Sequence, residues 1–275
     1  MKSMAFYNGK IGAIDEISIP LSDRSVYFGD GVYDAAVCKN SQIYEKNEHL
    51  DRLYRNLEKL SITPYCTREF LIDILDSLVS DRIGISFIYI QMSRSLPTRT
   101  HSAVGATTNL LITVNPITLT DPSSRMSLIS TEDLRYFYCD IKTVNLLPAV
   151  IASTLADSFA CDEAVFHRNG TVTECAHSNI FILQSGVLKT HPTNNLILPG
   201  ITRNHTIRSA KSIGLEVAES PFTVDEMLTA DEIFITSTSK FCKAVDSIDG
   251  QTVGGRCPNI ANRLCSSVYN DFLRF

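Results

Sequence analysis

The stretch CDIKTVNLL, residues 139–147, places one lysine, Lys142, in a largely apolar segment. Lys142 becomes informative together with two later segments: GTVTECAHSN, residues 170–179, and LPGITR, residues 198–203. The first of these carries Glu174, 32 residues after the lysine, and the second has the form of a loop that leads into a helix. A lysine in an apolar segment is, by itself, most often a side chain whose ammonium group reaches water. The lysine, the glutamate and the junction are therefore informative as an ordered set.

This ordered set resembles the class IV pyridoxal-phosphate aminotransferases, which include D-amino-acid and branched-chain aminotransferases and aminodeoxychorismate lyase. The resemblance runs over nearly the whole chain. It implies an α+β protein of fold type IV, in which two α/β domains hold the cofactor in the cleft between them. It also implies that Lys142 forms the Schiff base with pyridoxal 5′-phosphate, that Glu174 faces the pyridine nitrogen, and that residues 198–203 bind the phosphate.

The chemistry of these residue types agrees with those roles. A lysine amine condenses with an aldehyde when its pKa is low enough to leave part of it neutral. Pyridoxal phosphate withdraws electrons best while its ring nitrogen is protonated, which a neighbouring carboxylate such as Glu174 favours. A phosphate binds where backbone N–H groups converge at a helix N-terminus, and Gly200 allows the backbone to approach it closely.

The resemblance implies further contacts with the cofactor. Arg52 matches the arginine that binds the phosphate, and its planar guanidinium can meet two phosphate oxygens at once. Without the resemblance, Arg52 would be interpreted as a surface arginine on an amphipathic helix. The remaining matches are one residue that packs on the cofactor ring and two groups that bind phosphate: Leu198; Ile201 and Thr202; Ser237 and Thr238.

Two segments indicate the member of the family. Residues 29–34 place Tyr33 just after a glycine turn, where the family lines its substrate pocket. Residues 94–101 contain Arg99 and His101, which resemble the pair that grips the substrate α-carboxylate in D-amino-acid aminotransferases. An arginine and a histidine two positions apart on an extended loop can face one site and both donate hydrogen bonds.

Some positions depart from that subgroup. Ser95 stands where a glycine is usual, and its backbone is less free than that of glycine. Residues 175–178 replace a small serine-rich run, and His177 either points at the edge of the cofactor or bonds to the backbone as a structural histidine. These departures concern the substrate range more than the reaction type.

The reaction that the resemblance implies is transamination of D-amino acids, with D-alanine and 2-oxoglutarate giving pyruvate and D-glutamate. Lys142 would act as Schiff base and proton shuttle in a ping-pong mechanism. The alternatives are branched-chain L-amino-acid transamination, aminodeoxychorismate lyase activity, or a non-catalytic protein that binds the cofactor. The presence of both Lys142 and Glu174 argues against the last. The resemblance further implies a homodimer in which Arg99 and His101 reach into the neighbouring subunit's site.

The composition is that of an ordinary soluble globular protein. The chain has 275 residues, 44% of them hydrophobic and 20% charged, and a net charge of −5 offers no general attraction to nucleic acid or acidic membranes. The N-terminal sequence lacks the apolar core of a signal peptide, and no apolar run approaches the ~20 residues that span a bilayer, so we expect a cytoplasmic protein. The eight cysteines have neither zinc-ligand nor disulfide-framework spacing, which predicts reduced, mostly buried thiols and no metal site.

The local patterns predict alternating elements in two domains. Asn8-Gly9 indicates a type I′ hairpin turn, and apolar residues at helical spacing predict helices near 50–60 and 70–78. Prolines and turn formers mark residues 116–124 as a linker between a smaller domain, 1–115, and a larger strand-rich domain, 125–275, that carries Lys142. The other predicted elements are strands at 84–93, 107–114, 164–167, 172–174, 180–183, 187–188 and 232–235, helices at 202–213 and 259–272, and a capping box at 223–226.

Overall fold

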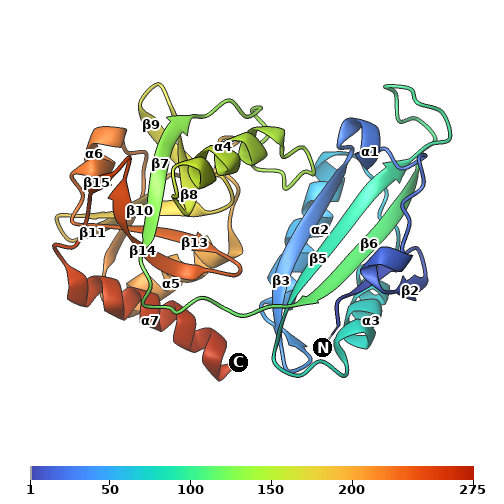
Figure 1. Ribbon diagram of the computed structural model, residues 1–275, viewed down its shortest axis with the longest axis horizontal. Coiled ribbons are helices and arrows are strands. Elements are labelled where there is room, and N and C mark those ends of the chain that lie inside the picture. The colour runs from blue at the N-terminus through green and yellow to red at the C-terminus, as the bar shows by residue number, and fades with distance from the viewer. Residues whose placement is uncertain (1) are drawn as a thin grey trace. The chain divides into compact units, whose positions relative to one another are not determined.

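The chain folds into two compact units, each built on its own sheet (Figure 1). The computed structural model describes residues 2–275. The first unit holds the chain up to Leu119 together with Ile141–Asn145, and the second holds Thr120–Asp140 and Leu146–Phe275.

The segment around Lys142 belongs to the first unit, whereas the division predicted from the sequence placed it in the C-terminal domain. Backbone hydrogen bonds explain this grouping. The Tyr33 amide donates to the Lys142 carbonyl over 2.9 Å, and the Val144 amide donates to the Gly31 carbonyl over 3.2 Å. The segment therefore pairs, antiparallel, with the start of the strand that begins at Gly31.

The first unit has a six-stranded antiparallel sheet in the order β2-β1-β6-β5-β3-β4. Its strands are β1 Met4–Tyr7, β2 Lys10–Gly12, β3 Gly31–Lys39, β4 Gln42–Ile43, β5 Ile85–Ser95 and β6 Thr107–Pro116. Asn8 and Gly9 join β1 to β2 with positive φ angles of 47° and 92°, which confirms the predicted hairpin turn.

Two longer helices supply the apolar side of this unit. The helices are η1 Ile14–Glu16, α1 Ser25–Phe28, α2 Lys46–Lys59 and α3 Arg68–Val79. Leu50, Leu53 and Leu57 of α2 and Leu71 and Leu75 of α3 are buried in one core with residues of β3, β5 and β6. The helices predicted from the spacing of apolar residues are thus confirmed, although Phe70, which belongs to that apolar pattern, is 55% exposed.

The second unit has a larger mixed sheet in the order β12-β11-β10-β13-β14-β7-β8-β9, with β15 paired to β14. Its strands are β7 Met126–Glu132, β8 Glu163–Arg168, β9 Thr171–Cys175, β10 Asn179–Gln184, β11 Val187–Thr190, β12 Glu216–Glu219, β13 Glu232–Ser237, β14 Phe241–Ile248 and β15 Gln251–Thr252. Its helices are α4 Leu147–Ser158, α5 Ile201–Ser212, α6 Val224–Leu228 and α7 Pro258–Arg274.

The strands predicted at 164–167, 172–174, 180–183, 187–188 and 232–235 are present in this unit, whereas strands β7, β12, β14 and β15 were not predicted. Thr223 and Glu226 exchange the two hydrogen bonds of the predicted capping box, over 3.1 and 2.8 Å. Helix α4 directly follows the Lys142 segment and was not predicted. All eight cysteines are free, and four of them are buried: Cys38, Cys175, Cys242 and Cys265. Within residues 2–275, no helix is both long and apolar enough to traverse a membrane.

Candidate active site

Lys142 lies beside an aromatic pair in the first unit. Its Nζ is 4.4 Å from the centre of the Tyr33 ring, which stacks on Tyr89 with 5.2 Å between the ring centres. The face of an aromatic ring attracts an ammonium group. The Tyr33 amide also donates to the Lys142 carbonyl. These two predicted site residues are therefore in contact through both their backbones and their side chains.

Arg52 is buried, which excludes the interpretation as a surface arginine. Only 3% of it is exposed, and its Nε and Nη2 donate to the two carboxylate oxygens of Asp34 over 2.8 and 2.9 Å. The Nδ1 of His49 lies 2.7 Å from the same carboxylate. Burial alone would raise the pKa of Asp34, but Arg52 and His49 hold that pKa below its usual range. Asp34, which directly follows Tyr33 in the chain, therefore stays ionised and holds the Arg52 guanidinium in place.

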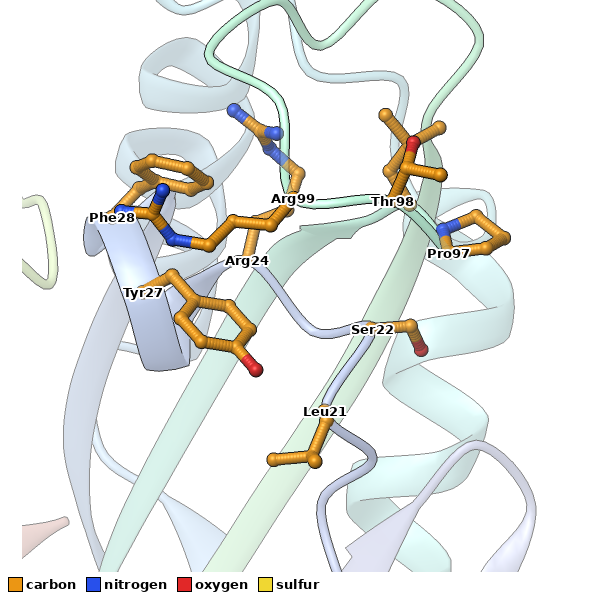
Figure 2. A pocket seen from close by; sticks show the side chains of 9 residues that line it. Leu21, Ser22, Arg24, Tyr27, Phe28, Pro97, Thr98 and Arg99 are labelled. Carbon is orange, nitrogen blue, oxygen red and sulfur yellow. The ribbon is translucent and has the colours of Figure 1, made fainter.

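Arg99 and His101 gather around one ring. The loop that carries them follows β5, and the Arg99 guanidinium carbon is 4.9 Å from the centre of the Phe28 ring. The His101 ring lies 5.5 Å from the same ring. Arg99, Tyr27 and Thr98 are among the residues that line a hollow of about 130 Å³. Figure 2 shows their side chains. The side chains of Arg99 and His101 are both exposed, so they are free to meet a ligand.

Glu174 is the buried carboxyl of the second unit. One oxygen, Oε1, accepts from Nη1 of Arg135 over 2.5 Å. The other, Oε2, accepts from Nδ2 of Asn179 over 2.9 Å and from the Leu198 amide over 3.0 Å. Burial raises the pKa of Glu174 to about 7, although Arg135 and the Leu198 amide act in the opposite direction. A carboxyl with this pKa can exchange or share a proton with a weakly basic ring nitrogen near neutral pH.

Arg135 was not predicted from the sequence, yet it orients Glu174. Asp133 accepts from its Nε and Nη2 over 2.9 and 3.0 Å and also accepts from Arg168 over 3.0 Å. The arginine and the glutamate are 39 residues apart, so no local pattern connects them. The Asp133-x-Arg135 spacing in the sequence could at most have suggested an ion pair.

The start of helix α5 has the features of a phosphate site. Gly200 precedes the helix and supplies no capping side chain, so the first amides, including those of Ile201 and Thr202, are not capped by it. A Cβ at Gly200 would lie 2.1 Å from the Asn179 amide oxygen. A side chain at this position would therefore force Asn179 to move, and Asn179 also donates to Glu174. The group around Glu174 and the helix N-terminus are thus built around one side chain.

The second hydroxyl-bearing segment lies at the end of β13. Ser237 is the last residue of that strand, and Thr238 begins the turn to β14. The predicted residues divide between the units. The first unit carries Tyr33, Arg52, Arg99, His101 and Lys142, and the second carries Glu174, Leu198, Ile201, Thr202, Ser237 and Thr238. The residue types fit three parts of pyridoxal phosphate. A lysine can react with its aldehyde, a carboxyl group can pair with its ring nitrogen, and a helix N-terminus without a capping side chain can bind its phosphate.

His177 and Cys175 flank this region. The His177 Nδ1 lies 3.0 Å from Oε1 of Glu163, and its backbone amide donates to the same oxygen over 2.9 Å. Lys240 donates to the other oxygen of Glu163 over 3.1 Å. Burial raises the pKa of the Cys175 thiol well above its usual value, so the thiol stays protonated.

Comparison with known proteins decides the family. The family model for amino-transferase class IV matches residues 31–248. The chain belongs to the class IV aminotransferases. It is therefore an enzyme of a family that uses pyridoxal 5′-phosphate. Its fold is the fold type IV of those enzymes.

The curated relatives of this aminotransferase match it over nearly their full length. It is 33% identical to a D-alanine aminotransferase of Bacillus licheniformis, covering 96% of this chain and 97% of that protein. It is also 33% identical to a D-alanine aminotransferase of Listeria innocua, covering 97% and 95%. The structure of the branched-chain amino acid aminotransferase of Escherichia coli superposes with a TM-score of 0.88 at 21% identity, covering 98% and 94% of the two chains. The last similarity is one of fold.

Proposed function

We propose that this enzyme transaminates D-amino acids, with D-alanine and 2-oxoglutarate giving pyruvate and D-glutamate in a ping-pong reaction. The observation that carries the proposal is the similarity to D-alanine aminotransferases over nearly the whole chain. The placement of Arg99 and His101 on one exposed loop beside one ring supports it, because two hydrogen-bond donors can then meet one carboxylate.

Lys142 is the proposed catalytic residue. Bound pyridoxal phosphate supplies an electron sink for the charge left when the substrate loses its Cα proton. Nζ of Lys142 would hold the cofactor aldehyde and afterwards carry the proton between the substrate Cα and the cofactor C4′. Tyr33 supports this role, since its ring lies against Nζ and its backbone holds that of the lysine.

Glu174 would keep the ring nitrogen protonated. Its Oε2 already accepts from two donors and its Oε1 from one, so Oε1 has room for one more donor. Arg135 and Asn179 hold the carboxyl plane of Glu174 in place. The carboxyl would therefore not have to reorient before it pairs with the proton on the ring nitrogen. Leu198, whose amide donates to this carboxyl, would pack on the cofactor ring.

The phosphate would be held by charge and by hydrogen bonds. Arg52 supplies the charge, and its guanidinium is already fixed by Asp34. The N-terminal amides of α5 supply hydrogen bonds, together with hydroxyl groups. The proposed ligands on the helix and on the second segment are Ile201, Thr202, Ser237 and Thr238.

We also propose a homodimer with shared sites, in which Arg99 and His101 serve the partner's cofactor. An apolar face on helix α4 supports an assembly, because Leu147, Val150 and Ile151 are 69%, 55% and 61% exposed. Apolar side chains gathered in this way are typical of a surface that another chain covers.

A cytoplasmic location stays a prediction from the sequence, which fractionation of cells tests.

A panel of amino donors tests the function. We expect purified enzyme with 2-oxoglutarate to convert D-alanine faster than L-alanine or L-leucine. If the enzyme converts L-leucine but does not convert D-alanine, the proposal is contradicted and branched-chain transamination is favoured. Release of pyruvate from aminodeoxychorismate without any transamination would favour the lyase.

A further inference from the structure

Arg24 is a buried cation that touches the loop carrying Arg99 and His101. Only 4% of it is exposed, and its Nε donates to Oδ2 of Asp30 over 2.7 Å. Its Nη1 donates to the backbone carbonyl of Thr100 over 2.6 Å, and its Nη2 donates to that of His101 over 3.0 Å. One guanidinium thus joins three acceptors, two of them in the loop.

The same side chain organises the ring that Arg99 and His101 contact. The guanidinium carbon of Arg24 lies 4.6 Å from the centre of the Phe28 ring, and that of Arg99 lies 4.9 Å from it. Figure 2 shows both guanidinium groups beside this ring. The exposed Arg99 therefore rests on a ring that the buried Arg24 helps to fix.

The loop is held at two points, and Arg99 lies between them. At its start, the Leu96 amide donates to the Ser22 carbonyl over 2.9 Å, and the Arg24 amide donates to the Arg94 carbonyl over 2.8 Å. Further along, the carbonyls of Thr100 and His101 accept from the guanidinium. The side chains of Arg99 and His101 project from a backbone that is anchored on both sides.

We propose that Arg24 is a positioning residue for the substrate carboxylate: it clamps the loop so that Arg99 and His101 are presented in one fixed geometry. This rests on the proposed function of those two residues. A flexible loop would have to lose conformational entropy when the substrate binds, whereas a clamped loop has lost it already. Removal of the clamp weakens substrate binding more than it slows the chemical step.

The test compares Arg24→Gln and Arg24→Lys with the parent as cofactor-loaded enzymes. Glutamine loses the charge, and lysine keeps it but cannot donate to both carbonyls in the arginine geometry. In single-turnover reactions with D-alanine, we expect the apparent dissociation constant to rise about tenfold in Arg24→Gln and less in Arg24→Lys. The rate at saturation should change less than about threefold in both. Amide exchange should accelerate in residues 96–106 and not in helices α2 and α3.

Arg82→Lys is the matched control. Arg82 is also buried in the first unit and also donates to a backbone carbonyl, that of Lys2, over 2.8 Å. It lies next to the start of β5, whereas the loop follows the end of that strand. We expect its substrate binding and loop exchange to match those of the parent.

Coupling to Arg99 separates positioning from general stability. If Arg24 acts through the loop, Arg24→Gln should weaken D-alanine binding much less in an Arg99→Ala background than in the parent. Equal weakening in both backgrounds, or parent-like binding in a folded Arg24→Gln variant, would overturn the proposal. If the parent does not transaminate D-alanine, the proposed function fails, and the exchange rates of residues 96–106 still show whether Arg24 clamps the loop.

Discussion

Nη1 of Arg135 lies 2.5 Å from Oε1 of Glu174, and this ion pair is enclosed in the second unit. Asp133 fixes the arginine from its other side. The carboxyl is thus oriented by a cation that has its own counterion, and burial still raises its pKa to about 7. A group in this state can stabilise a protonated ring nitrogen while remaining close to its own titration point.

Arg135→Met should destabilise the protein by about 3 kcal/mol at pH 8, because it leaves a buried carboxylate without its cation. Arg168→Met is the matched control, since Arg168 also pairs with Asp133 but, in the described part of the chain, forms no ion pair with Glu174. Denaturant unfolding of both variants at pH 8 measures the difference. Equal losses would mean that the arginines act only through Asp133.

Stability of the cofactor-free protein should depend on the ionisation of Glu174. Its pKa in the folded protein, about 7, is above the ordinary value of 4.5, so between these values the folded protein binds more protons than the unfolded chain. The free energy of unfolding should therefore fall as the pH rises from 4.5 to 7, by on the order of 2–3 kcal/mol from this group. Denaturant titrations at pH 5 and pH 8 should show this decrease in the parent and a smaller one in Glu174→Gln. The same decrease in both proteins would assign it to other groups.

Gly200→Ala should weaken cofactor binding by at least about tenfold, because a Cβ would lie 2.1 Å from the Asn179 oxygen and force Asn179 to move. Asn179 donates to Glu174 and to the Leu198 carbonyl, next to the start of α5. Gly214→Ala, just beyond the other end of the same helix, is the control: it strains a φ of +84° in open space. It should lower stability and leave the affinity unchanged. Titration of both apoenzymes with pyridoxal phosphate, followed by absorbance, measures this. Equal affinities would show that this junction does not bind the phosphate.

Borohydride reduction of the loaded enzyme should attach the cofactor to Lys142, since its Nζ lies by the Tyr33 ring in a segment that the family resemblance marks. Peptide mapping of the adduct identifies the lysine. Lys142→Ala should yield no adduct and should lack the absorbance of the bound aldehyde. An adduct on Lys240 or any other lysine in the parent would refute the assignment.

Mixing two inactive variants tests the shared site. If Arg99 serves the partner's cofactor, a dimer of one Lys142→Ala chain and one Arg99→Ala chain has one intact site and one site with both lesions. Random mixing makes about half of the dimers mixed, so activity should return to roughly a quarter of the parent's. If Arg99 serves its own subunit, nothing returns, provided that mass spectrometry confirms the exchange of subunits.

The amino-acid sequence by itself determined the elements whose signals lie within a few residues. Leu50, Leu53 and Leu57 predicted helix α2, and the helix buries them. Asn8-Gly9 predicted the hairpin, and Thr223 with Glu226 predicted the cap of α6. Each of these signals is local, because a helix turn, a two-residue turn and a capping box depend on neighbours in the chain. The ordered residues around Lys142 and Glu174 also indicated the family that the comparisons then showed.

Only the tertiary structure decided which residues surround the candidate site. Arg135 meets Glu174 across 39 residues of sequence, and Arg24 meets the carbonyls of Thr100 and His101 across 76 and 77. The Lys142 segment joins the first unit because its backbone pairs with Gly31 and Tyr33, far earlier in the chain. Such contacts depend on how the sheets bring distant strands and loops together. No periodicity or spacing encodes them, because chain closure and burial, rather than local propensity, select these partners.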